Sequence, residues 1–370
     1  KGVCVLKSLI KGCEALGMAT IDSGCHAFFG YPITPQTELV AYLSKKMPEN
    51  NRLIIQAESE ISAINMVYGA AAAGFRVMTS TASPGMSLKV EGISYIAGSE
   101  LPCVIVNVCR VGPGLGGIQP SQQDYFFCTK ALGHGGFKVI VLAPNSVQEI
   151  YDLTMEAFVL ADKYRNPVIM FLDGTLGQMM EPLSINNQNS NGVDSIEDIR
   201  AYKPWSANGT LDREHRNIVR SLYLDNNDLK VQMDKLREKY SIMKQEVRFE
   251  SIGFDVHTHI ILVCFGIVSR ICEKAREVLK EQGINVSIIR PITLWPFPYE
   301  EIRNRSKSSE YGFLCVEMNF GQMVEDVVLG CNGENKVYSC AIVEGSIMDH
   351  KDIIENVSRI IKGEKYEYKI

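Results

Sequence analysis

Glu60 is the residue of this sequence whose type and position most directly suggest chemistry. It stands in the segment QAESEISAINMVYGAAAAG at residues 56–74. Apolar residues recur there at three- and four-residue spacing, which predicts a helix over 58–74 whose buried face consists of Ile61, Ile64, Val67, Tyr68 and Ala71. Glu60 would lie in the first turn, one residue before that face, where the helix dipole stabilises a carboxylate. It is either a functional carboxylate or a solvated acid at a helix start.

Arg110 is a second candidate, because it closes the apolar segment LPCVIVNVCR at residues 101–110. An arginine can bind a carboxylate through two parallel hydrogen bonds, which a lysine cannot do. The alternative is a surface charge at the end of a strand. A third segment, GYPITPQT at residues 30–37, is a turn rich in proline and threonine that contains Thr34.

The glycines after Arg110 raise the question of a dinucleotide site. Gly112, Gly114 and Gly117 satisfy GxGxxG after a strand. That fingerprint needs a helix that opens directly on the glycines and an acidic residue about twenty positions further on. Pro120 interrupts the segment, and residues 131–143 contain no Asp or Glu. We therefore predict a mobile loop beside a substrate pocket, with a nicotinamide-dependent dehydrogenase as an alternative function.

Five blocks of this sequence resemble the alpha subunit of the 2-oxoacid:ferredoxin oxidoreductases, specifically the branched-chain type that acts on 2-oxoisovalerate (3-methyl-2-oxobutanoate). The blocks are GYPITPQ at 30–36, QAESEISAINMVYGAAAAG at 56–74, SPGMSLKVEGISYIAGSELPCVIVNVCR at 83–110, GPGLGGIQPSQQDYF at 112–126 and APNSVQE at 143–149. The resemblance weakens through 184–255 and recovers around PITLWPFP at 291–298.

The resemblance implies a site and an activity. Glu60 matches the family glutamate that hydrogen-bonds N1′ of the aminopyrimidine of thiamine diphosphate, which makes it both cofactor-binding and catalytic. Thr34 and Arg110 match the family residues that approach the carboxylate of the substrate. The complex would oxidatively decarboxylate a branched-chain 2-oxoacid to acyl-CoA and reduce ferredoxin, as in anaerobic metabolism. A 2-oxoglutarate:ferredoxin oxidoreductase subunit and a non-catalytic scaffold subunit are the alternatives.

Partner subunits are implied by what the chain lacks. Thiamine diphosphate enzymes hold Mg²⁺ and the diphosphate with a GDG motif and a later Asn, whereas this chain has only LDGTLGQ at 172–178. We therefore expect that half of the site on a beta subunit. The eleven cysteines form no CxxC, so the iron–sulfur clusters are expected on ferredoxin-like and gamma subunits. His257 and His259 share one face of a strand, but two imidazoles without a third ligand indicate a surface, and no metal site is predicted.

Composition narrows the partners and the compartment. Hydrophobic residues make up 46% of the 370 residues, and no apolar run approaches the length of a membrane span. The net charge of −5 argues against nucleic acid as a partner. No signal peptide is apparent at the observed start, so the cysteines indicate a reducing cytoplasm.

Alternating elements predict the fold class, an α/β protein with a parallel sheet. Strands are expected at 53–56, 77–80, 103–109, 138–142 and 168–172, between helices at 36–46, 58–73, 84–97 and 147–163. With the resemblance, residues 1–185 are expected to form the pyrimidine-binding domain for thiamine diphosphate. A polar linker and charged helix would occupy 186–255, and a smaller transketolase-C-terminal-like α/β domain 256–370.

Overall fold

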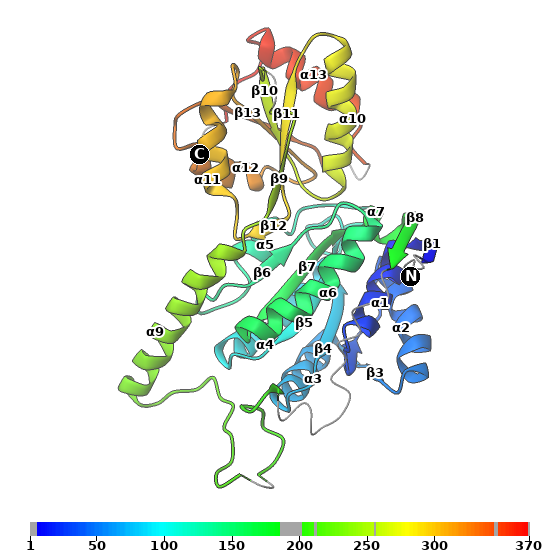
Figure 1. The fold of residues 1–370 in the computed structure, drawn as a ribbon, viewed down its shortest axis with the longest axis vertical. Coiled ribbons are helices and arrows are strands. Elements are labelled where there is room, and N and C mark those ends of the chain that lie inside the picture. The colour runs from blue at the N-terminus through cyan, green and yellow to red at the C-terminus, as the bar shows by residue number, and fades with distance from the viewer. Residues whose placement is uncertain (1–5, 186–201, 211–212, 255–256, 344–346, 369–370) are drawn as a thin grey trace, which may run out of the picture.

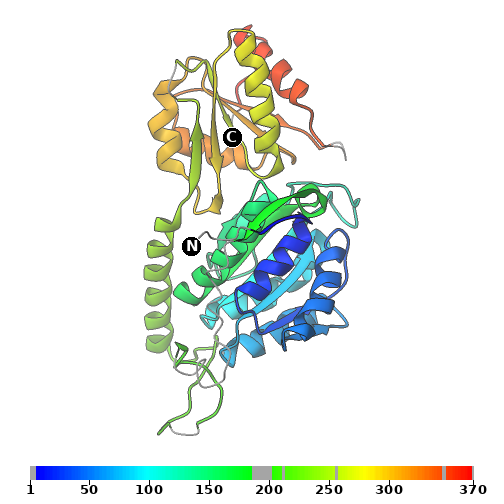
Figure 2. The same ribbon diagram turned by 45° about the vertical axis from the view of Figure 1, so that its right-hand side comes forward.

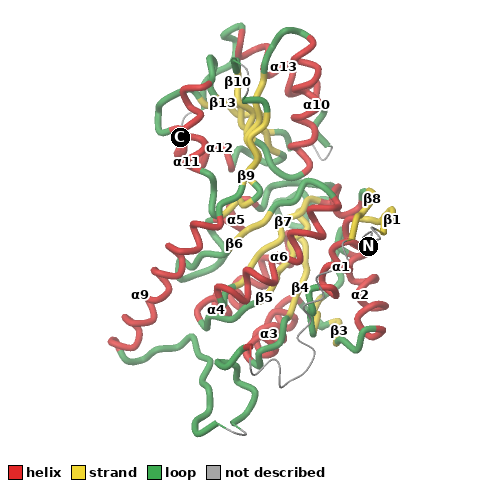
Figure 3. The backbone as a smooth tube through the Cα atoms, in the orientation of Figure 1, coloured by secondary structure: helices red, strands yellow, loops and turns green. Residues whose placement is uncertain are grey.

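The computed structural model consists of two α/β units, the first at the bottom of Figure 1 and the second at the top (Figures 1 and 2). The structure describes residues 6–185, 202–210, 213–254, 257–343 and 347–368. In the backbone tube, helices surround the strands of both large sheets (Figure 3).

The first unit is built on a sheet whose strands run in the order β12-β6-β7-β5-β4-β2-β3. Every strand except β12 pairs in parallel with its neighbours. All residues of β4, β5 and β7 are buried, which is typical of a parallel sheet covered on both faces. The parallel strands are β2 (Ala27–Gly30), β3 (Leu53–Gln56), β4 (Val77–Ala82), β5 (Cys103–Cys109), β6 (Ile140–Leu142) and β7 (Pro167–Asp173).

Helices cover both faces of this sheet. One face carries α1 (Gly12–Asp22), α2 (Thr37–Glu49) and α6 (Val147–Tyr164), and the other carries α3 (Glu60–Ala72) and α4 (Ser83–Gly98). The close packing of α3 on α4 depends on Gly92, where a Cβ would approach a side-chain carbon of Ile64 to 2.6 Å. The remaining elements of this unit are the short helices α5 (Tyr125–Thr129) and α7 (Gly174–Gln178) and the antiparallel pair β1 (Leu6–Lys11) and β8 (Met180–Ile185).

The predicted face of α3 is partly wrong. Ile64, Val67 and Ala71 are buried, but Ile61 is 51% exposed, and Glu60 itself belongs to the buried face. The helix packs between β2, β4 and α4, and these neighbours select the face that includes Glu60. A carboxylate therefore occupies a position where the sequence pattern alone would place an apolar side chain.

The second unit has a sheet in the order β14-β13-β10-β11-β9, in which β10 and β11 are parallel. Helices α10 and α13 cover one face, and α11 and α12 cover the other. The strands are β9 (Phe249–Ile252), β10 (Ile260–Val263), β11 (Val286–Pro291), β13 (Phe313–Glu317) and β14 (Val337–Ala341). The helices are α10 (Ile267–Glu281), α11 (Tyr299–Arg305), η2 (Ser306–Ser308), α12 (Met323–Cys331) and α13 (His350–Ile361).

Two strands complicate the expected division of the chain. β9 lies in the segment expected to be linker and helix, yet it pairs with β11 in the second sheet. β12 (Thr293–Trp295) comes from the second unit, yet it pairs with β6 in the first sheet. The boundaries at 185 and 255 therefore remain a proposal, and residues 186–201 and 255–256 lie outside the described part of the chain.

The charged helix expected in the middle of the chain is α9 (Asn226–Met243), followed by the short η1 (Lys244–Glu246). It lies alongside the first unit (Figure 2). Lys235 and Lys239 form ion pairs with Glu100, which follows the carboxyl end of α4. Among the described residues, no helix is both long and apolar enough to cross a membrane.

Hydrogen bonds join the two units at the segment that follows Arg110. Gln122 donates from Nε2 to the carbonyl of Phe265 at 2.9 Å and accepts from the backbone N–H of Met318 at 3.1 Å. Gln322 accepts from the backbone N–H of Phe126 at 2.8 Å. The second unit therefore holds the end of the loop that begins beside Arg110.

Candidate active site

The candidate residues meet at the carboxyl edge of the first sheet. Thr34 follows β2, Glu60 begins the helix after β3, and Arg110 follows β5. The chain passes from β2 outward to β3 and then back to β4 on the other side of β2. Ligands of open parallel sheets bind outside the carboxyl ends of strands at such a reversal.

Glu60 is the first residue of α3, and Ser59 caps the helix by accepting a hydrogen bond from the backbone N–H of Ser62 at 3.2 Å. Its side chain is only 5% exposed. Within the described part of the chain, no hydrogen-bond donor reaches its carboxylate. The carboxylate oxygens are not among the fully enclosed polar atoms without a partner, so they keep access to the edge of the sheet, where the helix dipole stabilises their charge and a ligand can approach them.

The space around the Glu60 side chain is made by Gly85 in the first turn of α4. A Cβ at Gly85 would lie 2.8 Å from Cγ of Glu60 and would also collide with Oε1 of Glu60 and Oγ1 of Thr81. Only a residue without a side chain fits there. The carboxylate therefore lies against the backbone of α4 at the end of β4.

Arg110 lies on the opposite side of Gly85 along the sheet edge and is 7% exposed. Its Nη1 donates to the carbonyl of Thr34 at 3.0 Å, and its Nη2 donates to the carbonyl of Leu115 at 3.2 Å. Its Nε is buried and has no partner among the described atoms. The structure thus joins Arg110 to the turn of Thr34, and it leaves one donor of a buried guanidinium free for an anion.

A polar network behind Arg110 was not predicted. Ser83 accepts from the backbone N–H of Arg110 at 3.0 Å and donates to Asp124 at 2.5 Å, and Asn107 also donates to Asp124 at 2.8 Å. The N-cap of α4 is Ala82, and the Ser83 hydroxyl forms hydrogen bonds with Arg110 and Asp124. The motif Ser83-Pro84-Gly85 is the sequence signal closest to this network. Arg110 and Asp124, the partners of Ser83, lie too far along the chain for a local pattern to identify them.

The glycine-rich segment after Arg110 is a loop, and no helix opens on its glycines. The next helix, α5, begins only at Tyr125. The backbone N–H of Gly112 donates to Gln123 at 2.7 Å, and that of Gly117 donates to the carbonyl of Val111 at 2.9 Å. This geometry does not provide the helix start that a dinucleotide pyrophosphate needs.

The LDG segment at the end of β7 has a structural use. Asp173 accepts hydrogen bonds from the backbone N–H groups of Thr175 at 2.9 Å and Leu176 at 3.0 Å, and so caps α7. Burial raises the pKa of Asp173 to about 6. Because this carboxylate is fully enclosed and already bonded, it is a poor candidate for an Mg²⁺ ligand.

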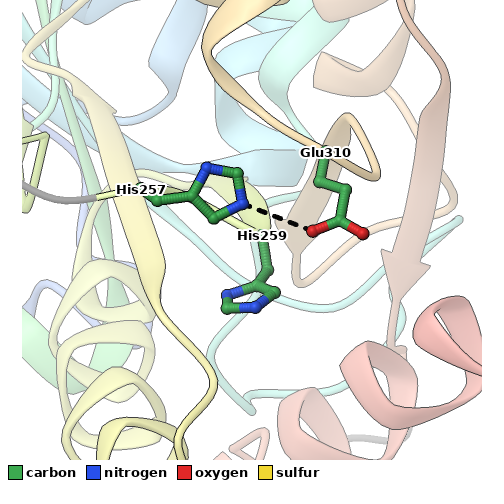
Figure 4. A group of neighbouring side chains, drawn as sticks. All are labelled: His257, His259 and Glu310. Atoms are coloured by element: carbon green, nitrogen blue, oxygen red, sulfur yellow. Dashed lines mark hydrogen bonds and ion pairs between the residues drawn. The ribbon is translucent and has the colours of Figure 1, made fainter.

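The histidine pair has a third polar neighbour that the sequence did not reveal. His257 lies 3.3 Å from Glu310, and the ligand atoms of His257, His259 and Glu310 all lie within 4.8 Å of one another (Figure 4). However, Nδ1 of His259 accepts a hydrogen bond from the backbone N–H of Asn285 at 3.0 Å. That bond leaves the proton on Nε2, whereas a ligating histidine donates from its other ring nitrogen. The absence of a metal site remains a prediction.

The cysteines of the described part of the chain are unpaired and buried. They are Cys13, Cys25, Cys103, Cys109, Cys128, Cys264, Cys272, Cys315, Cys331 and Cys340, while Cys4 lies outside that part. Burial raises the pKa of Cys109 and Cys128 well above the usual value for a thiol. These residues are small core side chains, and no thiolate among them is prepared to ligate a cluster.

Comparison with known families defines the class of protein. The family described as "Pyruvate flavodoxin/ferredoxin oxidoreductase, thiamine diP-bdg" matches residues 18–248, and "Pyruvate:ferredoxin oxidoreductase core domain II" matches residues 258–353. The chain belongs to this family of thiamine-diphosphate-binding 2-oxoacid:ferredoxin oxidoreductase subunits. The predicted fold class is confirmed, with a thiamine-diphosphate-binding α/β domain followed by a smaller α/β domain.

Individual relatives carry more specific names. The chain is 46% identical to the ketoisovalerate oxidoreductase subunit VorB of Methanothermobacter marburgensis, over 96% of this chain and 98% of the relative. It is 32% identical to the 2-oxoglutarate synthase subunit KorA of Archaeoglobus fulgidus, over 96% of this chain and 99% of the relative.

Two solved structures share the fold. The 2-oxoglutarate:ferredoxin oxidoreductase of Magnetococcus marinus, with 2-oxoglutarate, coenzyme A and succinyl-CoA bound, has a TM-score of 0.81 at 25% identity. The match covers 96% of this chain and 65% of that chain. A split-gene transketolase, an inactive beta4 tetramer, has a TM-score of 0.57 at 12% identity over 96% of this chain and 99% of that chain, a likeness of fold alone.

Proposed function

We propose that this chain is the alpha-type subunit of a complex that oxidatively decarboxylates a branched-chain 2-oxoacid, 2-oxoisovalerate, to acyl-CoA with reduction of ferredoxin. The similarity to a ketoisovalerate oxidoreductase subunit, at 46% identity over nearly the whole length of both chains, supports this substrate. The lower identity to a 2-oxoglutarate synthase subunit makes 2-oxoglutarate the second candidate.

The observation that carries the catalytic part of the proposal is the Glu60 carboxylate, which is buried without a donor at the carboxyl edge of the sheet. That environment fits a partner able to donate a hydrogen bond, such as a protonated ring nitrogen. Thiamine diphosphate, when bound, supplies the nucleophilic carbon that decarboxylation of a 2-oxoacid requires. Glu60 would hydrogen-bond N1′ of its aminopyrimidine and hold or return a proton at that atom.

Arg110 and Thr34 would recognise the substrate. The unpartnered Nε of Arg110 can donate to a carboxylate oxygen, and Nη2 can join it if the carbonyl of Leu115 gives up its hydrogen bond. Thr34 is exposed beside Arg110, and its carbonyl fixes the other end of the guanidinium. The same groups would bind either 2-oxoacid, so preference depends on the pocket around the side chain of the substrate.

The remaining cofactors are proposed on partner subunits in the cytoplasm. A beta subunit would hold Mg²⁺ and the diphosphate, because Asp173 of the LDG segment is committed to capping a helix. Ferredoxin-like and gamma subunits would carry the iron–sulfur clusters and pass electrons to ferredoxin, because the cysteines of the described part are enclosed in apolar cores. Coenzyme A would accept the acyl group.

The test uses the co-expressed complex, purified without oxygen, with a viologen dye as electron acceptor. We expect activity that requires thiamine diphosphate, a preference for 2-oxoisovalerate over competing 2-oxoglutarate, and loss of activity in Glu60→Gln. Glu91→Gln, an exposed acid on α4, is the matched control and should retain activity.

Other outcomes identify the alternatives. Preference for 2-oxoglutarate would reassign the substrate without changing the mechanism. Full activity of an assembled Glu60→Gln complex would show that the chain is a scaffold subunit and that Glu60 is only an acid at a helix start. Stabilisation of the chain by NAD(H) in a thermal shift assay would revive the dehydrogenase alternative.

A further inference from the structure

The loop that follows Arg110 is closed at its base by a side chain. Oε1 of Gln123 accepts a hydrogen bond from the backbone N–H of Gly112 at 2.7 Å, across eleven residues of the chain. Beside this bond, the backbone N–H of Val111 donates to the carbonyl of Gln119 at 3.1 Å. The loop therefore begins and ends at the same place, directly after Arg110.

The middle of this loop contacts the guanidinium of Arg110. The carbonyl of Leu115 accepts from Nη2 at 3.2 Å, while the side chain of Leu115 is 80% exposed and does not anchor the backbone. The neighbours Gly114 and Gly116 have positive φ angles of 70° and 57°, which glycine adopts freely. The position of the Leu115 carbonyl, and with it the orientation of the guanidinium, therefore depends on the bonds that close the loop.

A residue of the second unit fixes Gln123 in turn. Gln322, immediately before α12, donates from Nε2 to the carbonyl of Gln123 at 2.8 Å and accepts at Oε1 from the backbone N–H of Phe126 at 2.8 Å. The backbone N–H of Gln322 itself donates to the side chain of Asn319 at 3.2 Å. One glutamine thus holds the backbone on both sides of the start of α5.

The neighbouring glutamine shows that this segment has two separate tasks. Gln122 is completely buried, and its side chain bonds only to backbone groups of the second unit, at Phe265 and Met318. The side chain of Gln123 bonds instead to Gly112, at the base of the loop beside Arg110. Gln122 therefore joins the two units, whereas Gln123 connects that junction to the loop.

We propose that Gln123 is a positioning residue for Arg110. It holds the loop so that the guanidinium keeps the orientation that binds the carboxylate of the substrate, and Gln322 makes this orientation depend on the second unit. The inference rests on the proposed role of Arg110 in substrate recognition. It gives the second unit a part in substrate affinity through two side chains that act by way of Arg110.

Steady-state kinetics of the complex test this role. Gln123→Met should raise KM for 2-oxoisovalerate by about fivefold to tenfold, the effect expected from one lost hydrogen bond. The kcat should stay within about twofold, because Arg110 binds the carboxylate in both the ground state and the transition state. KM for coenzyme A should not change. A merely structural contribution would reduce the active fraction, and so kcat, without moving either KM.

Two further variants test the connection itself. Gln123→Glu keeps the oxygen that accepts from Gly112 and should restore KM for 2-oxoisovalerate to the value of the wild type. Gln322→Met removes both bonds to the backbone around α5 and should raise the same KM. Because the two glutamines act on one loop in series, the double variant should be no worse than the more affected single variant.

A matched control is Gln232→Met. Gln232 of α9 is also a buried glutamine that donates to the backbone of a separate element, the carbonyl of Gly98 at 3.4 Å. Gly98 is the last residue of α4, whereas the candidate site lies at the first turn of that helix. Gln232→Met should leave KM for 2-oxoisovalerate unchanged.

Arg110→Met, measured in the same preparation, separates the two possible failures. An unchanged KM for 2-oxoisovalerate in Gln123→Met would overturn the inference if Arg110→Met raises that KM. An unchanged KM in Arg110→Met would instead overturn the proposed role of Arg110, and the inference with it. If Gln123→Met does not assemble, Gln322→Met decides, and an unchanged KM in that variant would overturn the inference.

Discussion

At the scale of single residues, the site depends on the absence of a side chain at Gly85. The Glu60 carboxylate occupies the space that a Cβ would fill, so its position is set by the backbone of α4. Gly69, on the exposed side of α3, provides a contrast, because a Cβ there would meet no atom within 4 Å. A side chain is therefore excluded at Gly85 and tolerated at Gly69.

We expect Gly85→Ala to displace Glu60 and reduce the activity of the complex by about a hundredfold, since a shift of about 1 Å in a catalytic group has effects of that size. Gly69→Ala should retain activity and stabilise the helix by about 0.5–1 kcal/mol. Steady-state kinetics and urea unfolding measure the two effects. Equal activity of the two variants would contradict the assigned position of Glu60.

At the scale of elements, the short helix α7 is capped by Asp173, a buried carboxylate whose ionisation costs free energy. Burial raises the pKa of Asp173 to about 6, above the value of about 3.9 in an unfolded chain, so the native state binds this proton more tightly. The stability that results is complete below about pH 4 and is lost as the pH rises through about 6, a change of about 2–3 kcal/mol. Asn caps a helix as well as Asp does but does not ionise.

Asp173→Asn should therefore gain stability relative to the wild type as the pH rises. We expect the difference in free energy of unfolding between the two proteins to move by about 2 kcal/mol between pH 4.5 and pH 7 in favour of the variant. Urea unfolding at both values measures it. Asp225→Asn, at the exposed N-cap of α9, is the control that measures the effect of replacing a capping Asp by Asn where the carboxylate is not buried. A difference that stays constant with pH would show that Asp173 does not titrate in this range.

At the scale of the whole molecule, Arg290 links the two units by charge. It lies in β11 with no exposed surface, and its Nη1 and Nη2 donate to Glu149 of α6 at 2.8 and 2.6 Å. Its Nε donates to Glu250 of β9 at 2.8 Å. One side chain therefore connects the first unit, the second sheet and the strand that leads into it.

Arg290→Met should lower the free energy of unfolding by about 3 kcal/mol, because it removes a buried cation that is bonded to the partly buried Glu149 and to the exposed Glu250. Arg237→Met removes an exposed ion pair with Asp234 and should change stability by less than about 0.5 kcal/mol. Urea unfolding followed by far-UV circular dichroism provides the comparison. A small effect of Arg290→Met would mean that the apolar contacts between the units carry the interface.

Features that depend on local pattern are predictable from the amino-acid sequence. The alternation of strands and helices and the bounds of long elements such as α6 and β5 follow from periodicity. The family resemblance also identified Glu60, Thr34 and Arg110 as candidates. A carboxylate that accepts a hydrogen bond and a guanidinium that binds an anion are evident from the residue types of Glu60 and Arg110. Parallel strands then require that residues after their carboxyl ends share one edge.

Features that depend on partners far along the chain become visible only in the folded structure. The inward direction of Glu60, the use of Ser83 by Arg110 and Asp124, and the burial of Lys89 between α3 and β4 depend on contacts between separate elements. The pairing of β9 with β11 in the second sheet and of β12 with β6 in the first sheet also depends on such contacts. The physical reason is that helix and strand periodicity specifies how side chains alternate, whereas the packing of neighbouring elements selects which face is enclosed and which charges meet there.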